Sequence, residues 1–225
     1  MTLWTYFKER YLDFRARKIG QGVQYSVYAC GHGRVIKIPA SSFRRFCIRL
    51  TWIDAGLTNV FKDLLQSRVN AERSFTGLQG RISENLSPLL GNPLLLDDFS
   101  YEQDLVKPVG EYFAENDYSS NVIIVDKYID SILDLWRFGI SDAVFNVTIN
   151  SGVDRHENVI LLDLGELIFN KDEVRRTIWT RRWLTQFSYL DIQDVKLRSY
   201  YAQSMLSRVT IESLDDHWKS AISNQ

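Results

Sequence analysis

The chain contains only two cysteines, Cys30 and Cys47, among its 225 residues. Two thiols cannot build a disulfide framework, and their spacing does not fit the paired ligands of a structural zinc site. The sequence also has no apolar run close to the roughly 20 residues that a helix needs to cross a bilayer. Its first ten residues lack the uninterrupted apolar core of a secretory signal. These absences predict a cytoplasmic protein without a membrane span.

The chain has almost no net charge. Lys and Arg together number 27, Asp and Glu number 28, and the formal net charge is -1 at pH 7. Such a balance gives no long-range field that would attract polyanions, so nucleic acid is not predicted as a partner. Hydrophobic residues make up 45% of the chain, an ordinary globular composition that suits one sizeable domain or two small lobes.

The first part of the chain has the pattern of a strand-rich lobe. Residues 17–39 are rich in β-branched and aromatic side chains with a Gly-His-Gly turn at 31–33, which predicts three consecutive antiparallel strands. An apolar stripe predicts a helix over 58–78, and Leu94 to Leu96 indicate a buried strand. A short amphipathic helix is expected over residues 4–16.

The second part is predicted to be mostly helical. Helices are expected over 103–115 and over 122–138, the latter apolar nearly all round and ended by Gly139. A loop and hairpin occupy 141–164, and the remainder has helical spacing of its large apolar residues. The fold class predicted is therefore α+β, with an N-terminal strand-rich lobe at 1–98 and a helical C-terminal lobe at 99–225.

A glycine-containing turn precedes the second predicted strand. Gly20 and Gly22 would let the backbone come close to a ligand, so that turn amides could point at phosphate oxygens. Val27 follows in the next strand, and Lys37 lies on the strand after that. Taken alone, the two glycines also fit a plain hairpin, and Lys37 also fits an exposed position on an edge strand.

Asn150 and Asp163 lie thirteen positions apart, with a turn and the apolar run Val159 to Leu162 between them. Two oxygen-bearing side chains at the ends of a hairpin can converge on one hard cation such as Mg²⁺, which often accompanies phosphates. The alternatives are a simple turn residue for Asn150 and a strand that ends in a turn at Asp163-Leu164-Gly165.

These segments together resemble the protein kinase-like superfamily, including aminoglycoside phosphotransferase-like and small atypical kinases. The resemblance lies in the glycine turn, the strand lysine, and the thirteen-residue spacing between a catalytic-loop Asn and the Asp of a D-F-G motif, within segment 141–166. Tyr25 replaces the third glycine of the usual loop, and Leu164 replaces the Phe of D-F-G.

The resemblance implies a two-lobed fold, with an N-terminal antiparallel sheet and one main helix, that binds ATP and Mg²⁺. In that fold the glycine loop, formed here by Gly20, Gly22 and Val27, would cover the phosphates, and Lys37 would pair with them. A carboxylate on the following helix would orient the lysine, for which Glu72 is the first candidate and Asp63 a weaker one. Metal ligands would be Asn150 and Asp163.

The general base is the point at which the sequence departs from the family pattern. The Asp expected five positions before Asn150 is replaced by Phe145, and the nearest upstream carboxylate is Asp142. Either the loop carries an insertion and Asp142 serves as the base, or the protein is a pseudokinase that acts as a nucleotide-binding or regulatory interaction module. Asp142 could also be a cap of the preceding helix, and Asn146 a turn cap or polar ligand.

No A-P-E segment or long activation loop follows Gly165. The resemblance therefore implies a compact bacterial-type kinase that is not switched by phosphorylation of such a loop. The acceptor would be a hydroxyl group of an unidentified protein or small molecule. In a third interpretation, a purely structural α+β protein, Lys37 and Asp163 would share no neighbourhood.

Overall fold

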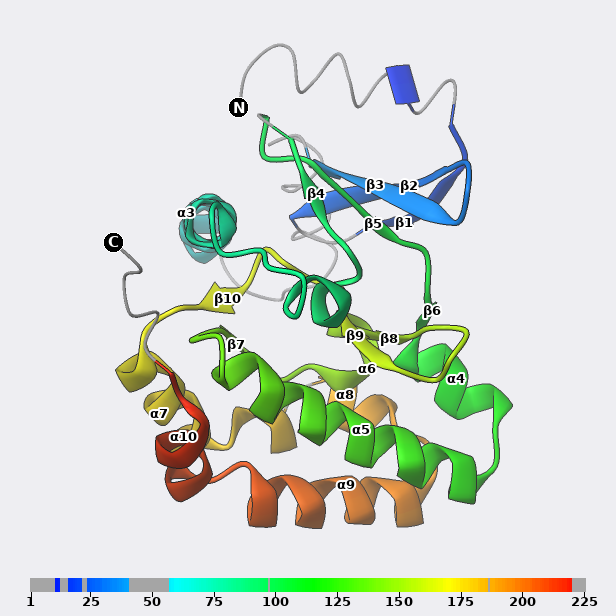
Figure 1. Ribbon diagram of the computed structural model, residues 1–225, viewed down its shortest axis with the longest axis vertical. Helices are drawn as coiled ribbons and strands as arrows, with labels where there is room; N and C mark the ends of the chain where they lie inside the picture. Colours follow the sequence, from blue (N-terminus) through cyan, green and yellow to red (C-terminus); the bar gives the residue numbers. More distant parts are fainter. Residues whose placement is uncertain are drawn as a thin grey trace. The chain divides into compact units, whose positions relative to one another are not determined.

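The computed structural model describes residues 11–12, 16–21, 24–40, 57–96, 98–185 and 187–219 (Figure 1). Most of the helix predicted over 4–16 lies outside these residues, as does Gly22. The chain divides into two compact units. The first comprises Met1–Arg81 and Asn92–Leu105, and the second comprises Ile82–Gly91 and Val106–Gln225.

The first unit contains an antiparallel sheet of five described strands in the order β1-β2-β3-β5-β4. Its strands are β1 (Lys18–Gln21), β2 (Tyr25–Cys30), β3 (Arg34–Pro39), β4 (Leu94–Leu95) and β5 (Tyr101–Asp104). The three strands predicted over 17–39 are therefore confirmed. Their second turn lies at the predicted Gly-His-Gly, where His32 and Gly33 have φ values of 65° and 72°.

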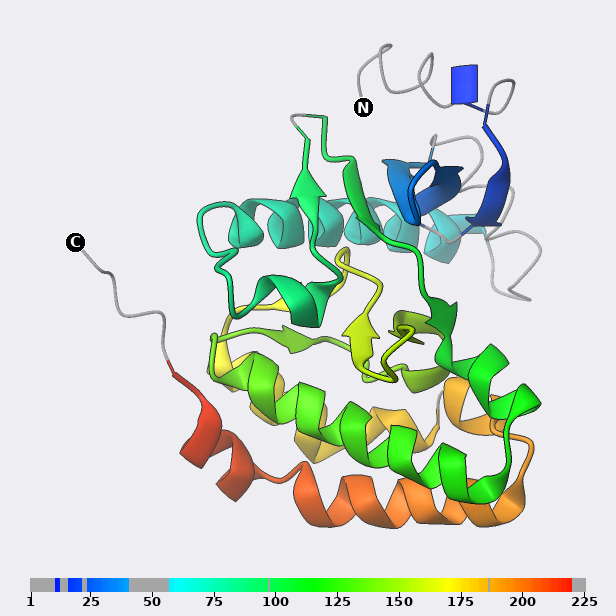
Figure 2. The ribbon, with the colours of Figure 1, turned by 45° about the vertical axis from the view of Figure 1, so that its right-hand side comes forward.

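Buried residues of this unit come from the sheet and from the long helix α3 (Leu57–Leu78), which Figure 2 shows end to end. Tyr28, Ile36 and Ile38 form a buried cluster on the sheet. On α3, the ring of Phe75 is buried and meets Phe99 edge to face, with ring centroids 5.3 Å apart. The helix predicted over 58–78 is confirmed. Its C-terminal half buries Ala71, Phe75 and Leu78, whereas Val69 is 54% exposed.

The helix predicted over 103–115 is wrong in its first half. Residues 101–104 form β5, in which Tyr101 and Gln103 are buried while their neighbours are partly exposed. This alternation follows from antiparallel pairing with β3, and Arg34 on β3 binds Asp104 at 2.9 Å. The helix proper, α4 (Val109–Glu115), begins only after Pro108, whose fixed φ suits a helix start.

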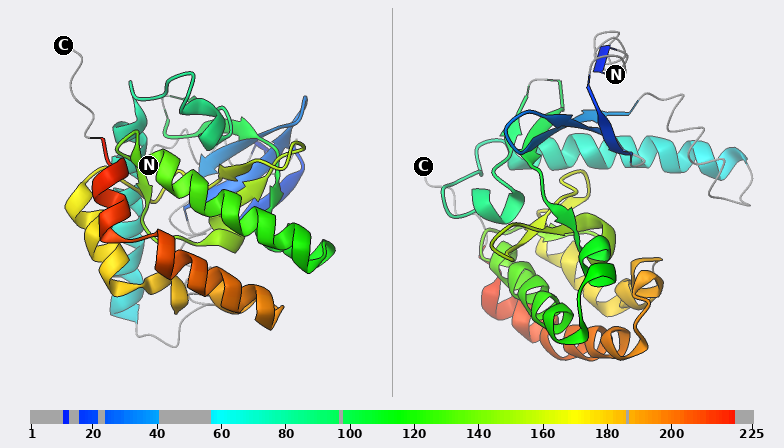
Figure 3. Two further views of the ribbon diagram at one scale, coloured as in Figure 1. Left: turned by 60° about the horizontal axis from the view of Figure 1, so that its bottom comes forward. Right: turned by 90° about the vertical axis from the view of Figure 1, so that its right-hand side faces the viewer.

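The second unit is built mainly from helices around α5 (Tyr118–Trp136) and α9 (Val195–Arg208), which pack along each other (Figure 3). Its other described helical segments are short: α4, η1 (Ser87–Leu90), α6 (Val147–Asn150), α7 (Lys171–Thr180), η2 (Arg182–Leu184), α8 (Phe187–Asp191) and α10 (Ile211–His217).

Helix α5 supplies much of the core of the second unit. It starts at an N-cap, Asp117, whose carboxylate accepts a hydrogen bond from Ser120 N at 2.8 Å. After its last turn the chain reverses at Gly139, which has φ 67°. The predicted helix over 122–138 thus exists but starts earlier, and it is not buried all round, because Ile123 is 51% exposed.

Two small sheets complete the second unit. One pairs β7 (Ser141–Asp142) with β10 (Leu167–Ile168), and the other has the order β6-β8-β9. The strands of the latter are β6 (Lys107–Pro108), β8 (Ser151–Val153) and β9 (Val159–Leu161). The hairpin predicted within 141–164 is therefore present as β8 and β9.

The architecture is α+β, as predicted: an N-terminal five-stranded antiparallel sheet with a helix, followed by a more helical C-terminal portion. Among the described residues, no helix combines the length and apolarity that crossing a membrane requires.

Substitution of Gly152 by Ala tests the packing around β8. A Cβ atom at this position would lie 2.4 Å from Val106 Cγ2 and 3.1 Å from both Leu162 Cδ1 and the Lys107 carbonyl oxygen. Because the last of these is backbone, we expect Gly152→Ala to lower the free energy of unfolding by about 1–3 kcal/mol, measured by denaturant titration.

Gly31→Ala is the matched control, because a Cβ there would have no heavy atom within 4 Å and its φ is not positive. Equal stability of the two variants would contradict the close approach at Gly152.

Candidate functional site

The β8–β9 hairpin brings Asn150 and Asp163 together although they are thirteen positions apart. Ser151 pairs with Leu161 in the register of the hairpin, so Asn150 and Leu162 are the next positions at its open end. The carbonyl oxygen of Asn150 accepts hydrogen bonds from the amides of Leu162 at 2.7 Å and Asp163 at 3.4 Å. Antiparallel pairing alone therefore places the two residues next to each other.

Asp142 joins them from a different strand pair. The Oδ1 atom of Asp163 accepts a hydrogen bond from Gly165 N at 2.8 Å, which closes a tight turn that leads into β10. Leu167 on β10 pairs with Asp142 on β7, and the amide of Ala143 donates to the Glu166 carbonyl at 2.9 Å. The turn after Asp163 thus returns the chain alongside Asp142.

The carboxyl group of Asp142 is buried and titrates in an unusual range. It is 5% exposed, and its pKa is raised to about 7, chiefly by this burial and also by the negative charge of Asp163. Hydrogen bonds from the amides of Val144 at 3.0 Å and Asn146 at 3.3 Å act in the opposite direction, as does the side chain of Asn150. The influence of Asp163 and Asn150 on this pKa agrees with the strand pairing, which brings the three residues into one neighbourhood.

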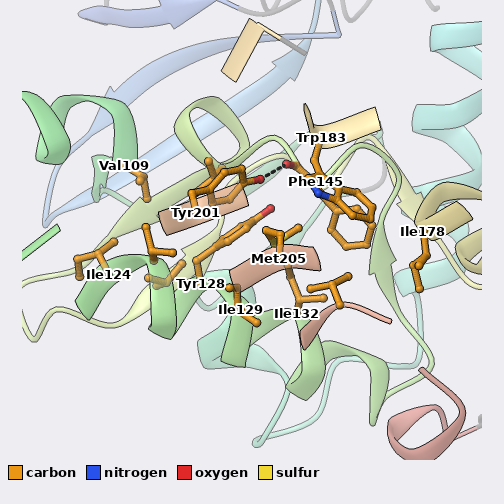
Figure 4. Packing of buried hydrophobic residues seen from close by; sticks show 14 of the residues in the cluster. Val109, Ile124, Tyr128, Ile129, Ile132, Phe145, Ile178, Trp183, Tyr201 and Met205 are labelled. Carbon is orange, nitrogen blue, oxygen red and sulfur yellow. Dashed lines mark hydrogen bonds between the residues drawn. The ribbon is translucent and has the colours of Figure 1, made fainter. Parts of the chain in front are cut away.

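Phe145 lies in the loop between Asp142 and Asn150, at the position where the resemblance predicts a base. It is fully buried and has φ 49°, a left-handed conformation that costs a bulky residue about 1–3 kcal/mol. Its ring packs edge to face on Trp183 with centroids 5.5 Å apart, and its carbonyl accepts a hydrogen bond from the Tyr201 hydroxyl at 3.3 Å (Figure 4). Phe145 is therefore a core residue that fixes the shape of the loop.

The polar atoms of Asn150 and Asp163 suit a hard cation. Asn150 is buried, and its Nδ2 lies close enough to the Asp142 carboxylate to lower the pKa of that group, although the two make no hydrogen bond of regular geometry. Carboxylate and amide oxygens are the donors that Mg²⁺ prefers.

The described residues contain no group of three or more His, Cys, Asp or Glu side chains that could hold a metal ion by themselves. A cation at Asn150 and Asp163 would therefore take its remaining ligands from phosphate oxygens and water, which is the usual arrangement for Mg²⁺.

In the first unit, the predicted nucleotide-binding residues lie across neighbouring strands. Gly20 on β1 pairs with Val27 on β2, and Val27 pairs with Lys37 on β3. A Cβ at Gly20 would meet only Val27, at an ordinary 3.6 Å. Packing within the described residues therefore does not itself require a glycine at position 20.

Lys37 is not an exposed residue on an edge strand. Strand β3 is the third of the five described strands, and Lys37 is only 8% exposed. Its Nζ lies 5.5 Å from the ring centroid of Tyr101, its partner on β5, a distance that favours cation–π attraction. The ammonium group is thus held at a defined place in the sheet.

The carboxylate of Glu72 binds a residue of its own helix. Its Oε1 accepts from Nε of Arg68 at 2.7 Å, and both side chains are more than 40% exposed. Its pairing with Lys37 stays a prediction. The side chain of Asp63, the weaker candidate, lies outside the residues whose side chains are described.

Two residues near Asp142 were not found from the sequence. Burial raises the pKa of both Tyr128 and Tyr201, and the nearby Asp142 carboxylate raises them further. The tyrosines come from α5 and α9, whose apolar spacing indicates only that they belong to a core. No local motif connects them to the loop at 142–150.

Comparison of the sequence with models of protein families and with curated proteins finds no match. The geometry of the molecule itself is therefore the basis for an interpretation of the site.

The turn of the β8–β9 hairpin gives a pH-dependent prediction. Partial burial tends to raise the pKa of Asp154, but hydrogen bonds from Asn158 and from the amide of His156 outweigh it, so the pKa lies below its ordinary value of 3.8. A carboxylate with a lowered pKa stabilises the fold above its unfolded pKa, and this contribution is lost as pH falls through the folded value. Asp154→Asn should therefore lower the free energy of unfolding at pH 7.

The difference in unfolding free energy between wild type and Asp154→Asn should shrink below pH 3.8, measured by denaturant titration at pH 7 and near pH 3. Asp216→Asn, at an exposed position of α10, is the control. A difference for Asp154→Asn that is independent of pH would contradict the role given to the ionised carboxylate.

Proposed function

We propose that this protein is an ATP- and Mg²⁺-dependent phosphotransferase with a protein kinase-like fold, which transfers the γ-phosphate to a hydroxyl group of a protein or small molecule. The observation that carries the proposal is the cluster of Asp142, Asn150 and Asp163 at the open end of the β8–β9 hairpin. These residues combine a titratable carboxylate with two oxygen donors, which are the groups that phosphoryl transfer needs.

Within the second unit, Asn150 and Asp163 would hold Mg²⁺ through their side-chain oxygens. The ion would supply positive charge to the phosphates. Asp142 would accept the proton of the attacking hydroxyl. Its pKa of about 7 supports this role, because a base of that strength is partly ionised at neutral pH and still binds a proton well.

Within the first unit, the backbone at Gly20 and Gly22 with the side chain of Val27 would cover the nucleotide, and Lys37 would bind its phosphates. The buried position of Lys37 on a central strand supports this role because it fixes a point charge in space. Glu72 would have to exchange Arg68 for Lys37. An exposed helical ion pair contributes only about 0.3–0.5 kcal/mol, so the exchange costs little.

The second candidate function is a pseudokinase that binds nucleotide as a regulatory or interaction module. The burial of Asp142 favours it, because both carboxylate oxygens accept hydrogen bonds from the amides of Val144 and Asn146 in the same loop. A carboxylate used in this way can be purely structural, and nucleotide would then bind without transfer.

Nucleotide binding itself is tested by the melting temperature. Millimolar ATP with Mg²⁺ should raise it, since a ligand at 100 times its Kd stabilises the folded form by about 2.7 kcal/mol. Asp163→Asn should remove most of this increase because it deletes the anionic metal ligand. Asp134→Asn, which alters an exposed ion pair on α5, should keep it. An unchanged melting temperature of the wild type would contradict both candidate functions.

Asp142→Asn separates the two candidates. For a phosphotransferase, turnover of labelled ATP should fall roughly 10²- to 10⁴-fold, the usual effect of losing a general base. The increase in melting temperature with Mg²⁺ and ATP should remain. Nucleotide binding by the wild type without any ATP turnover would contradict the phosphotransferase and favour the pseudokinase.

A further inference from the structure

The loop of residues 142–150, here named the base loop, is held by its own backbone at two places. The Asp142 carboxylate accepts hydrogen bonds from Val144 N and Asn146 N, which flank Phe145 on either side. The Asn146 carbonyl in turn accepts from Asn150 N at 2.8 Å. The Asn146 amide belongs to the same peptide group as the Phe145 carbonyl, so its direction depends on the conformation at Phe145.

The conformation at Phe145 is unfavourable by itself and needs contacts to maintain it. Its φ of 49° lies in the left-handed region, which a bulky side chain rarely adopts. Rotation at this residue to an ordinary negative φ would turn the peptide group that joins Phe145 to Asn146, and with it the Asn146 amide. The carboxylate of Asp142 would then lose its hydrogen bond from Asn146 N.

The described polar contact from outside the base loop to Phe145 comes from Tyr201. The Tyr201 hydroxyl donates to the Phe145 carbonyl at 3.3 Å, and both residues are fully buried. Tyr201 lies in the middle of α9, which packs along α5, and its ring lies 6.3 Å from that of Tyr128. Figure 4 shows the Tyr201 hydroxyl directed at the Phe145 carbonyl. The donor is therefore carried by a rigid part of the second unit.

We propose that Tyr201 is a positioning residue, whose hydroxyl holds the Phe145 carbonyl and so keeps the base loop in the form that places Asp142 beside Asn150 and Asp163. The contribution to catalysis rests on the proposed function, but the effect on the loop does not. Asn150 and Asp163 are held in addition by the hairpin, through the Asn150 carbonyl, which accepts from the amides of Leu162 and Asp163. Loss of the Tyr201 hydroxyl should therefore disturb the base more than the metal ligands.

The competing interpretation is that the hydroxyl of Tyr201 only satisfies a buried carbonyl and stabilises the core as a whole. The two interpretations predict different effects when the Tyr201 hydroxyl is removed. A positioning role predicts a local change in the base loop and a change in kcat, whereas a general core role predicts lower global stability with an intact loop.

Tyr201→Phe removes the hydroxyl and keeps the ring, and Tyr200→Phe is the matched control on the same helix. The Tyr200 hydroxyl binds Asp126 at 2.9 Å, away from the base loop. Hydrogen exchange of the Asn146 amide is measured by NMR in the full chain, at a temperature where both variants are folded. We expect exchange at least about tenfold faster than wild type in Tyr201→Phe, because this amide shares a peptide group with the Phe145 carbonyl, and unchanged exchange in Tyr200→Phe.

Kinetics with Mg²⁺ and ATP provide the second measurement. In Tyr201→Phe we expect kcat to fall roughly 10- to 100-fold, as for a misplaced catalytic group, with KM for ATP changed less than about twofold. Tyr200→Phe should keep both values.

Exchange of the Asn146 amide that is no faster in Tyr201→Phe than in Tyr200→Phe would overturn the proposal, whether or not the protein turns over ATP. Unchanged kcat in an active enzyme would overturn it as well. Faster exchange in a protein that shows no ATP turnover would support the hold on the loop and would count against the phosphotransferase alone.

Discussion

The site depends on the register between β8 and β9. The Asn150 carbonyl accepts hydrogen bonds from the amides of Leu162 and Asp163. These backbone hydrogen bonds make the side chains of Asn150 and Asp163 neighbours, although the two residues are thirteen positions apart. A slip of one residue would turn each side chain to the opposite face of the hairpin. Gly152 resists such a slip, since its missing Cβ lets Val106 and the Lys107 carbonyl approach closely. The chemistry proposed here thus rests on ordinary backbone hydrogen bonds.

Around that hairpin, burial and hydrogen bonding act against each other on one carboxyl group. Removal of Asp142 from water favours its neutral form, while the amides of Val144 and Asn146 favour the charged form. The result is a group close to the balance point between its two forms at neutral pH. The same contacts that make Asp142 suitable as a base also make it a structural part of its loop, which is why two candidate functions share one geometry.

Local patterns were sufficient for much of the fold. The strands at 17–39, the helix α3 and the hairpin ends at Asn150 and Asp163 follow from turn residues and apolar spacing in neighbouring positions. Local patterns were insufficient where pairing between residues far apart in the sequence determines the structure. β5 is a strand because β3 accepts it at a separation of about 65 residues, and the burial of Lys37 follows from the same pairing. The contact of Tyr201 with Phe145 joins residues 56 positions apart, which no short motif records.

The division of the chain has a consequence for how it can fold. The first unit is interrupted, because residues 82–91 belong to the second unit before Asn92–Leu105 return to the first. A nascent chain that has emerged only as far as α3 lacks β5, and β3 then has an unpaired edge. Strand β5 can pair with β3 and complete the sheet only after Asp104 has emerged from the ribosome. For the same reason, no single cut in the polypeptide yields two fragments that each contain one whole unit.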